Sequence, residues 1–108
     1  MKLYVGGAWQ GQEELAVQEN PGALILADFH EKIREAAAAG EDPREFARRI
    51  CASHPDAVIV ANEVGAGVVP MRAEDRAFRE AVGRALCIIA QNAESVTRSV
   101  CGIGVRIK

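Results

Sequence analysis

The sequence predicts an α/β fold with a mainly parallel sheet flanked by helices and an antiparallel hairpin at its C-terminal end. Two continuous apolar runs, ALILA at residues 23–27 and AVIVA at residues 57–61, alternate with helical patterns, as strands covered on both faces do in parallel sheets. The chain ends on residues 103–108, in which apolar and polar side chains alternate. At 108 residues the chain is expected to form a single domain spanning residues 1–108.

The predicted elements follow one another in the order strand, helix, strand, helix, helix, strand, helix and hairpin. Glycine and proline mark their ends, because these residues interrupt helical and strand patterns. Asp42 and Pro43 supply an acidic N-cap and a first-turn proline for the third helix. The expected strands are residues 3–5, 23–27 and 57–61 with a hairpin over residues 95–107, and the expected helices are residues 10–19, 29–39, 42 onward and 73–92.

Composition and charge exclude several classes of function. The formal net charge of −2 offers no broad basic field, so we expect no nucleic-acid partner. No apolar run reaches the length of a membrane helix and the N-terminal run is too short for a signal peptide, so we expect no membrane association and a cytoplasmic location. Cys51, Cys87 and Cys101 are widely spaced among apolar residues and are expected to be reduced core thiols.

A short strand, a glycine-rich turn and a helix open the chain as KLYVGGAWQGQEE. The spacing of Gly6 and Gly11, with Gly7 as a further backbone donor, fits a P-loop, in which backbone amides hold phosphate. Gln12 and Glu13 stand where that motif has Lys and Ser or Thr. A carboxylate 4 Å from a phosphate charge costs about 4 kcal/mol at an effective dielectric constant of about 20. We therefore expect a turn kept for its geometry and no functional nucleoside triphosphate site.

Polar residues also follow the two longer apolar strands, at the sheet edge where ligands of open α/β folds lie. Asp28 either binds magnesium at the end of its strand or caps the following helix, and the cap is the favoured interpretation. Asn62 and Glu63 either hydrogen-bond a ligand or hold the glycine loop that follows them. Gly65 and Gly67 in that loop allow backbone conformations that other residues resist.

The remaining candidate side chains have ordinary structural interpretations. Arg76, Arg79 and Arg84 on the long helix can bind an anion, but charged residues opposite an apolar stripe usually form a solvated face. His30 and His54 lie far apart without a cysteine or an acid at ligand spacing, and we expect each at the surface or at a helix cap. The residues by themselves predict no catalytic group and no metal site.

The string NEVGAGVVP at residues 62–70 and the ending CGIGVRIK resemble the adenosylcobinamide kinase/adenosylcobinamide-phosphate guanylyltransferase family of cobalamin biosynthesis. The likeness runs from about residue 56 to residue 108 and includes Arg76 and Arg79, and the opening GGA looks like the start of that family's P-loop. It implies a reduced RecA-like P-loop fold, a trimeric homo-oligomer and a corrinoid partner. GTP or ATP with magnesium would be the cofactors if the family's activity is retained.

The same resemblance implies that catalytic parts are missing. Members of the family transfer a guanylyl group through a histidine between the P-loop helix and the strand that residues 24–28 resemble, and this interval is almost absent here. His30 and His54 lie outside it, and Leu86 and Cys87 replace an Asn-Gln pair. We expect a catalytically degenerate relative that acts as a binding, regulatory or scaffold protein. The alternatives are an active enzyme of the same step with altered nucleotide binding, or a folded remnant without ligands.

Overall fold

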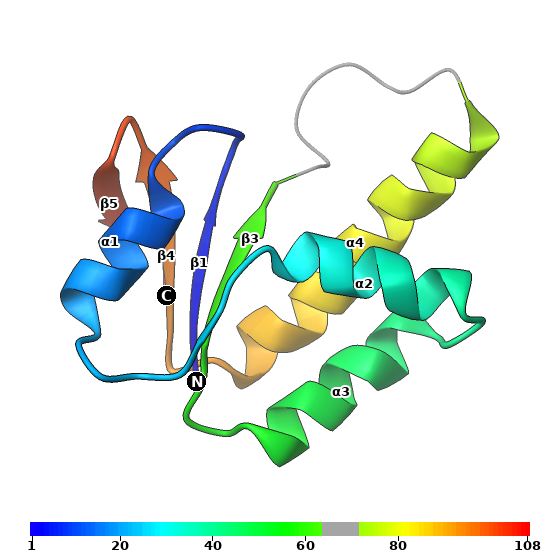
Figure 1. The fold of residues 1–108 in the computed structure, drawn as a ribbon, viewed down its shortest axis with the longest axis horizontal. Helices are drawn as coiled ribbons and strands as arrows, with labels where there is room; N and C mark the ends of the chain where they lie inside the picture. Colours follow the sequence, from blue (N-terminus) through cyan, green and yellow to red (C-terminus); the bar gives the residue numbers. More distant parts are fainter. Residues whose placement is uncertain (64–71) are drawn as a thin grey trace.

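The computed structural model describes residues 1–63 and 72–108 (Figure 1). Four helices pack around one five-stranded sheet in this part of the chain. The strands are β1 (Lys2–Gly6), β2 (Ile25–Leu26), β3 (Val58–Asn62), β4 (Ser95–Val100) and β5 (Ile103–Arg106). The helices are α1 (Gln12–Glu19), α2 (Phe29–Ala38), α3 (Pro43–Ser53) and α4 (Ala73–Asn92).

The sheet has the strand order β2-β3-β1-β4-β5 with β1 at its centre. β1 pairs in parallel with both β3 and β4, β2 pairs in parallel with β3, and β5 runs antiparallel to β4. The predicted α/β class, the mainly parallel sheet and the antiparallel C-terminal hairpin are therefore confirmed. Gly6 lies opposite Asn62 on one side and Ser99 on the other, so the three central strands reach the same edge of the sheet together.

Alternating side chains of the central strands form two apolar clusters on opposite faces of the sheet. Tyr4 and Val60 join Ala16 of α1 in the smaller cluster. Leu3 and Ile59 join the apolar sides of α2, α3 and α4 in the larger one. In Figure 1, α1 lies on one side of the strands, and α2, α3 and α4 lie on the other. No helix in the described ranges is long and apolar enough to cross a membrane.

The prediction that residues 23–27 form a strand covered on both faces is wrong. Only Ile25 and Leu26 are extended in the sheet, and Leu24 keeps 53% of its surface exposed. β2 is the edge strand beside β3, so it has a neighbour on one side only. An apolar run in the sequence does not distinguish a central strand from an edge strand.

The prediction of core thiols is wrong for Cys87 and Cys101 and partly confirmed for Cys51, which packs against the larger cluster. Cys87 and Cys101 are exposed, and Cys51 is half-buried; all three are free. Cys87 lies on the side of α4 opposite the buried Ala85 and Ile89, and Cys101 lies in the turn between β4 and β5. Apolar neighbours in sequence therefore gave no information about which face of the helix or which turn position each cysteine occupies.

Candidate functional site

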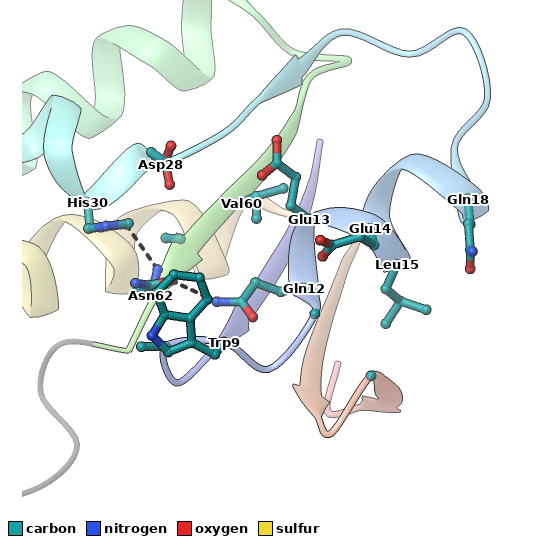
Figure 2. Close-up of a pocket in the computed structure, with 14 residues that line it drawn as sticks. Trp9, Gln12, Glu13, Glu14, Leu15, Gln18, Asp28, His30, Val60 and Asn62 are labelled. Atoms are coloured by element: carbon teal, nitrogen blue, oxygen red, sulfur yellow. Dashed lines mark hydrogen bonds between the residues drawn. The ribbon is translucent and has the colours of Figure 1, made fainter.

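A pocket of about 580 Å³ lies at the carboxyl edge of the sheet (Figure 2). Its walls come from the loop between β1 and α1, the first two turns of α1, the start of α2, the end of β3 and the β4–β5 turn. The register of the central strands explains this convergence, because the segments after β1 and β3 emerge at the same level. This is the edge at which the sequence predicted ligand-binding residues.

The loop between β1 and α1 is fixed by the β4–β5 hairpin. The carbonyl oxygen of Gln10 accepts from the Gly102 N–H at 2.8 Å and from the Ser99 hydroxyl at 2.6 Å. The Gln10 side-chain oxygen accepts from the Cys101 N–H at 2.7 Å. Gly11 has φ +80°, and a Cβ there would lie 3.2 Å from the Gly102 Cα. The second glycine of the motif is thus required by its conformation and by the hairpin, without any bound phosphate.

The first glycine of the motif is required by crowding at the end of β1. A Cβ on Gly6 would lie 2.8 Å from the backbone oxygen of Ser99 and 3.1 Å from the side-chain oxygen of Gln12. Gly7 is different, because its nearest neighbour would lie at 3.7 Å from such a Cβ. The spacing that resembles a P-loop therefore has a packing explanation at Gly6 and at Gly11.

Gln12, at the position of the P-loop lysine, is buried and bonded to the protein. Its Nε2 donates to Asn62 Oδ1 at 2.8 Å, to the Gly7 oxygen at 3.2 Å and to the Gly6 oxygen at 3.3 Å. An amide nitrogen carries two hydrogens, so three acceptors already use its full donor capacity. Figure 2 shows this side chain reaching toward Asn62. Gln12 therefore has no donor left for a ligand in the pocket.

His30 and Asn62 join the start of α2 to the end of β3. The Asn62 N–H donates to His30 Nδ1 at 3.1 Å, so Nδ1 is unprotonated and a neutral ring carries its hydrogen on Nε2. His30 is 7% exposed and lines the pocket, so the expectation of a surface or cap residue is wrong. That expectation is confirmed for His54, which is the exposed C-cap of α3. The position of His30 two residues after Asp28, at the edge predicted for ligands, was the signal available in the sequence.

Glu63 ties the end of β3 to β1 and β4. Its N–H donates to the Gly6 oxygen at 2.7 Å, and its Oε2 accepts from Arg98 Nε at 3.1 Å. These contacts give Asn62 and Glu63 a role in holding strand ends that the sequence did not suggest, and binding of a ligand by either stays a prediction. Gly65 and Gly67 lie outside the described residues. Arg76 and Arg79 lie on α4 and are not among the described residues that line the pocket.

The interpretation of Asp28 as the N-cap of the following helix is confirmed for its position but not for its side chain. The residue occupies the N-cap position of α2, but its side chain makes no capping hydrogen bond and its backbone is left-handed at φ 50° and ψ 42°. Aspartate tolerates this region better than most residues, at a cost on the order of 1 kcal/mol. Its carboxylate instead lines the pocket (Figure 2). Arg76 and Arg84 are exposed on α4 and Arg79 is half-buried there, and none of the three is among the described residues that line the pocket.

The charge of the pocket is unfavourable for phosphate. Glu13, Glu14 and Asp28 contribute carboxylates, and no Lys or Arg is found among the described lining residues. Glu13 and Glu14 also lie in the first turn of α1, where they offset the positive end of the helix dipole. Three like charges on the pocket wall repel a phosphate group. The described residues also contain no group of three or more His, Cys, Asp or Glu side chains that could hold a metal ion such as magnesium.

Trp9 is a pocket residue that the sequence argument missed. It is 99% exposed with φ 64°, lines the pocket, and is the single tryptophan of the chain. An aromatic residue inside a glycine-rich turn was the available signal, because a turn selected for geometry alone has no need of a large apolar side chain. Its indole places a fluorescent group at the mouth of the pocket (Figure 2).

Comparison with known proteins adds the family to this geometry. Residues 10–107 match the family described as Cobinamide kinase / cobinamide phosphate guanyltransferase. Over 51 residues, 47% of this chain, the sequence is 47% identical to the Bifunctional adenosylcobalamin biosynthesis protein CobU of Salmonella typhimurium and equally to that of Escherichia coli. These stretches span 28% of the length of each relative. The family match covers most of the chain, and the chain therefore belongs to the cobinamide kinase / cobinamide phosphate guanyltransferase family.

Proposed function

We propose that this chain is a non-catalytic member of its family that keeps the strand, loop and helix of the nucleotide site as a scaffold and acts as a binding or regulatory protein in cobalamin biosynthesis. The observation that carries the proposal is the side chain of Gln12. The P-loop motif has a lysine at this position, and its ammonium group faces phosphate. Gln12 is instead buried, and its amide donates hydrogen bonds to oxygens of Gly6, Gly7 and Asn62.

Electrostatics support the same conclusion. Replacing lysine by Gln12 removes an attraction, and Glu13 adds a repulsion of about 4 kcal/mol at 4 Å and an effective dielectric constant of about 20. The two changes act in the same direction, and Glu14 and Asp28 on the pocket wall add to the second. A loss of this size corresponds to several powers of ten in the dissociation constant of a nucleotide.

Nucleotide binding by the wild-type chain tests the proposal. Calorimetry with GTP and ATP, each with and without magnesium, is expected to show no binding at millimolar nucleotide. Trp9 fluorescence gives a second readout, because the indole lines the pocket and no other tryptophan contributes. Saturable binding below 1 mM, or measured kinase or guanylyltransferase turnover by the chain alone, would establish the competing function of an active enzyme with altered nucleotide binding.

A double variant tests the assigned cause. Gln12→Lys with Glu13→Ser restores the motif residues and is expected to bind GTP at least tenfold more tightly than wild type. Glu14→Ser with Gln18→Lys is the matched control, since it makes the same types of substitution and the same change of charge at two other pocket residues of α1. Equal gains in both variants would show that net charge, and not the position of the lysine, limits binding.

Because the chain belongs to a cobinamide kinase family, we propose a corrinoid as its ligand. Cobinamide added to the wild-type chain is expected to raise its melting temperature, whereas GTP is not. A melting temperature unchanged by cobinamide at millimolar concentration would leave the scaffold role as the surviving form of the proposal.

A further inference from the structure

The pocket at the carboxyl edge of the sheet carries acidic side chains without a counter-charge. Glu13, Glu14 and Asp28 line it, and none of them forms an ion pair with any residue that the structure describes. Acidic side chains elsewhere, such as Glu41 beside α3 and Glu80 on α4, pair with arginines. The pocket therefore differs from the rest of the described surface in the balance of its charges.

The N-terminus of α1 does not cancel this negative charge. A helix N-terminus is equivalent to about half a positive charge, against three carboxylates on the pocket wall. Clefts lined by charges of one sign focus their field and raise the local concentration of counter-ions. The pocket that repels a phosphate group is thus expected to attract a cation.

The side-chain oxygen of Gln12 indicates the kind of group that the pocket accepts. Gln12 lines the pocket and is 6% exposed, and its Oε1 accepts no hydrogen bond from the described residues. Every fully buried side-chain nitrogen or oxygen atom among these residues has a partner, so Oε1 keeps contact with the pocket. An ammonium group carries only donors and suits this acceptor. The neighbouring His30 does not oppose such a ligand, because its Nε2 lies 3.8 Å from Glu31 Oε1.

Trp9 is an independent observation that points to the same chemistry. Its side chain lines the pocket while 99% of the residue surface stays exposed. The two cation–π contacts of the described residues use Phe46 and Phe78, so the indole face is open to a ligand. Among aromatic side chains tryptophan is the best partner for an ammonium group.

The distribution of the carboxylates favours an organic cation over a metal ion. No group of three or more His, Cys, Asp or Glu side chains in the described ranges could hold a metal ion. Glu13 and Glu14 point about 100° apart around α1, and Figure 2 shows the apolar Val60 between Glu13 and Asp28. Separated charges with apolar surface between them match ammonium groups that are joined by methylene chains.

We propose that this pocket binds a linear polyamine, a small organic cation with two or more ammonium groups. One ammonium group stacks on Trp9 and donates to Gln12 Oε1, and another pairs with Glu13 or Asp28. The volume of about 580 Å³ is ordinary for a small-ligand site. The inference rests on the proposed loss of nucleotide binding, because a nucleotide would occupy the same pocket.

Titration of the full chain with spermidine, followed by Trp9 fluorescence, tests the proposal. At low ionic strength we expect a saturable change with a dissociation constant below about 1 mM. Raising NaCl from about 20 mM to about 200 mM should weaken binding at least threefold, because the carboxylates are exposed and screened by salt. 1,8-Octanediol, which has methylenes without charge, and magnesium chloride should give no saturable change below about 10 mM.

Variants of the same shape test the assigned residues. Asp28→Asn and Glu13→Gln each remove one charge and are expected to raise the dissociation constant of spermidine at least threefold. Asparagine also tolerates the left-handed backbone of Asp28. Glu35→Gln is the matched control, because Glu35 is exposed on α2 outside the pocket lining, and it should leave binding unchanged. Trp9→Leu, measured by calorimetry, should weaken binding at least threefold, and circular dichroism verifies that each variant folds.

The outcomes separate this inference from the proposed function. No saturable response to about 10 mM spermidine would overturn polyamine binding and leave the proposed function standing, since GTP and ATP are titrated separately. Saturable GTP binding would overturn the proposed loss of nucleotide binding, whatever the response to spermidine. An equal response to 1,8-octanediol or to magnesium, or an equal effect of Glu35→Gln and Asp28→Asn, would overturn the assignment of the polyamine to this pocket.

Discussion

Gln12 Nε2 donates to Asn62 Oδ1 at 2.8 Å, which ties the first turn of α1 to the end of β3. The same nitrogen reaches the Gly6 oxygen at the end of β1. One side chain therefore joins three elements that the chain brings together from positions up to 50 residues apart. Gln12 replaces the motif lysine, and its amide hydrogens are therefore already bonded to oxygens of the protein.

The first prediction concerns this side chain. Gln12→Ala removes the donor and leaves three oxygens without it, so we expect a loss of about 1–3 kcal/mol in the free energy of unfolding. Urea denaturation measures the change. Gln18→Ala on the same helix is the control, because Gln18 is exposed and its replacement should stay within about 0.5 kcal/mol of wild type. Equal stability of both variants would contradict the structural role.

The arrangement of strands was predictable from short-range patterns. Residues 57–61 predicted the parallel core correctly, because all five of these apolar side chains are buried. The alternating C-terminal residues predicted the antiparallel edge strand, although their apolar side chains are exposed. Residues 23–27 have a similar composition but form only a two-residue edge strand. The difference lies in the neighbours of each strand in the sheet, and these neighbours are not encoded in the run itself.

The sequence predicted the site correctly only at its glycines, where the backbone conformation or the lack of a side chain is itself the requirement. Gly11 has a positive φ that favours glycine, and Gly6 sits against a backbone oxygen. The bonds of Gln12 to Asn62 and of His30 to the Asn62 amide join residues 50 and 32 positions apart. Such contacts depend on the strand order, so the sequence identified the edge of the sheet but not which side chains meet there.

The second prediction contrasts two glycines. Gly6→Ala would place a Cβ 2.8 Å from the Ser99 oxygen, and we expect it to cost about 1–3 kcal/mol through a forced backbone shift. Gly83 on α4 has no neighbour within 4 Å of such a Cβ, so Gly83→Ala should stabilise the chain by about 0.5–1 kcal/mol. Thermal unfolding followed by circular dichroism separates the two. A stabilising Gly6→Ala would show that the contact relaxes without cost.

The third prediction concerns the link between the loop and the hairpin. Ser99 is 1% exposed and its hydroxyl donates to the Gln10 oxygen at 2.6 Å, so Ser99→Ala should cost about 1–3 kcal/mol and make the loop between β1 and α1 more sensitive to protease. Ser53→Ala is the control, since its exposed hydroxyl donates to the Arg49 oxygen at the same length. An unchanged cleavage rate in Ser99→Ala would argue against the link.

The fourth prediction is a pH dependence at the start of α3. Asp42 accepts from the Arg44 N–H at 2.8 Å, and this backbone hydrogen bond lowers the pKa of Asp42 below its ordinary value. A depressed folded-state pKa contributes stability that is present above the unfolded pKa, near 3.9, and is lost as the pH falls through the folded value. Asp42→Ala should therefore lower the melting temperature at neutral pH and less so in acid. Asp42→Asn keeps a capping oxygen and should lose the pH dependence while retaining most of the cap.

The fifth prediction concerns Tyr4, the single tyrosine of the chain. Burial raises its pKa above the ordinary value, and the hydrogen bond that its hydroxyl donates to Glu19 Oε1 at 2.7 Å raises it further. A raised folded-state pKa means that this contribution to stability is complete below about pH 10 and is lost as the pH rises through the folded value. Near-ultraviolet absorbance of the phenolate should give a midpoint above that of the chain unfolded in urea. Glu19→Gln removes the negative charge and should lower the midpoint without abolishing the shift, because Tyr4 remains buried. A wild-type midpoint equal to that of the unfolded chain would contradict the prediction. It would mean that Tyr4 is open to solvent and that α1 does not close the smaller apolar cluster.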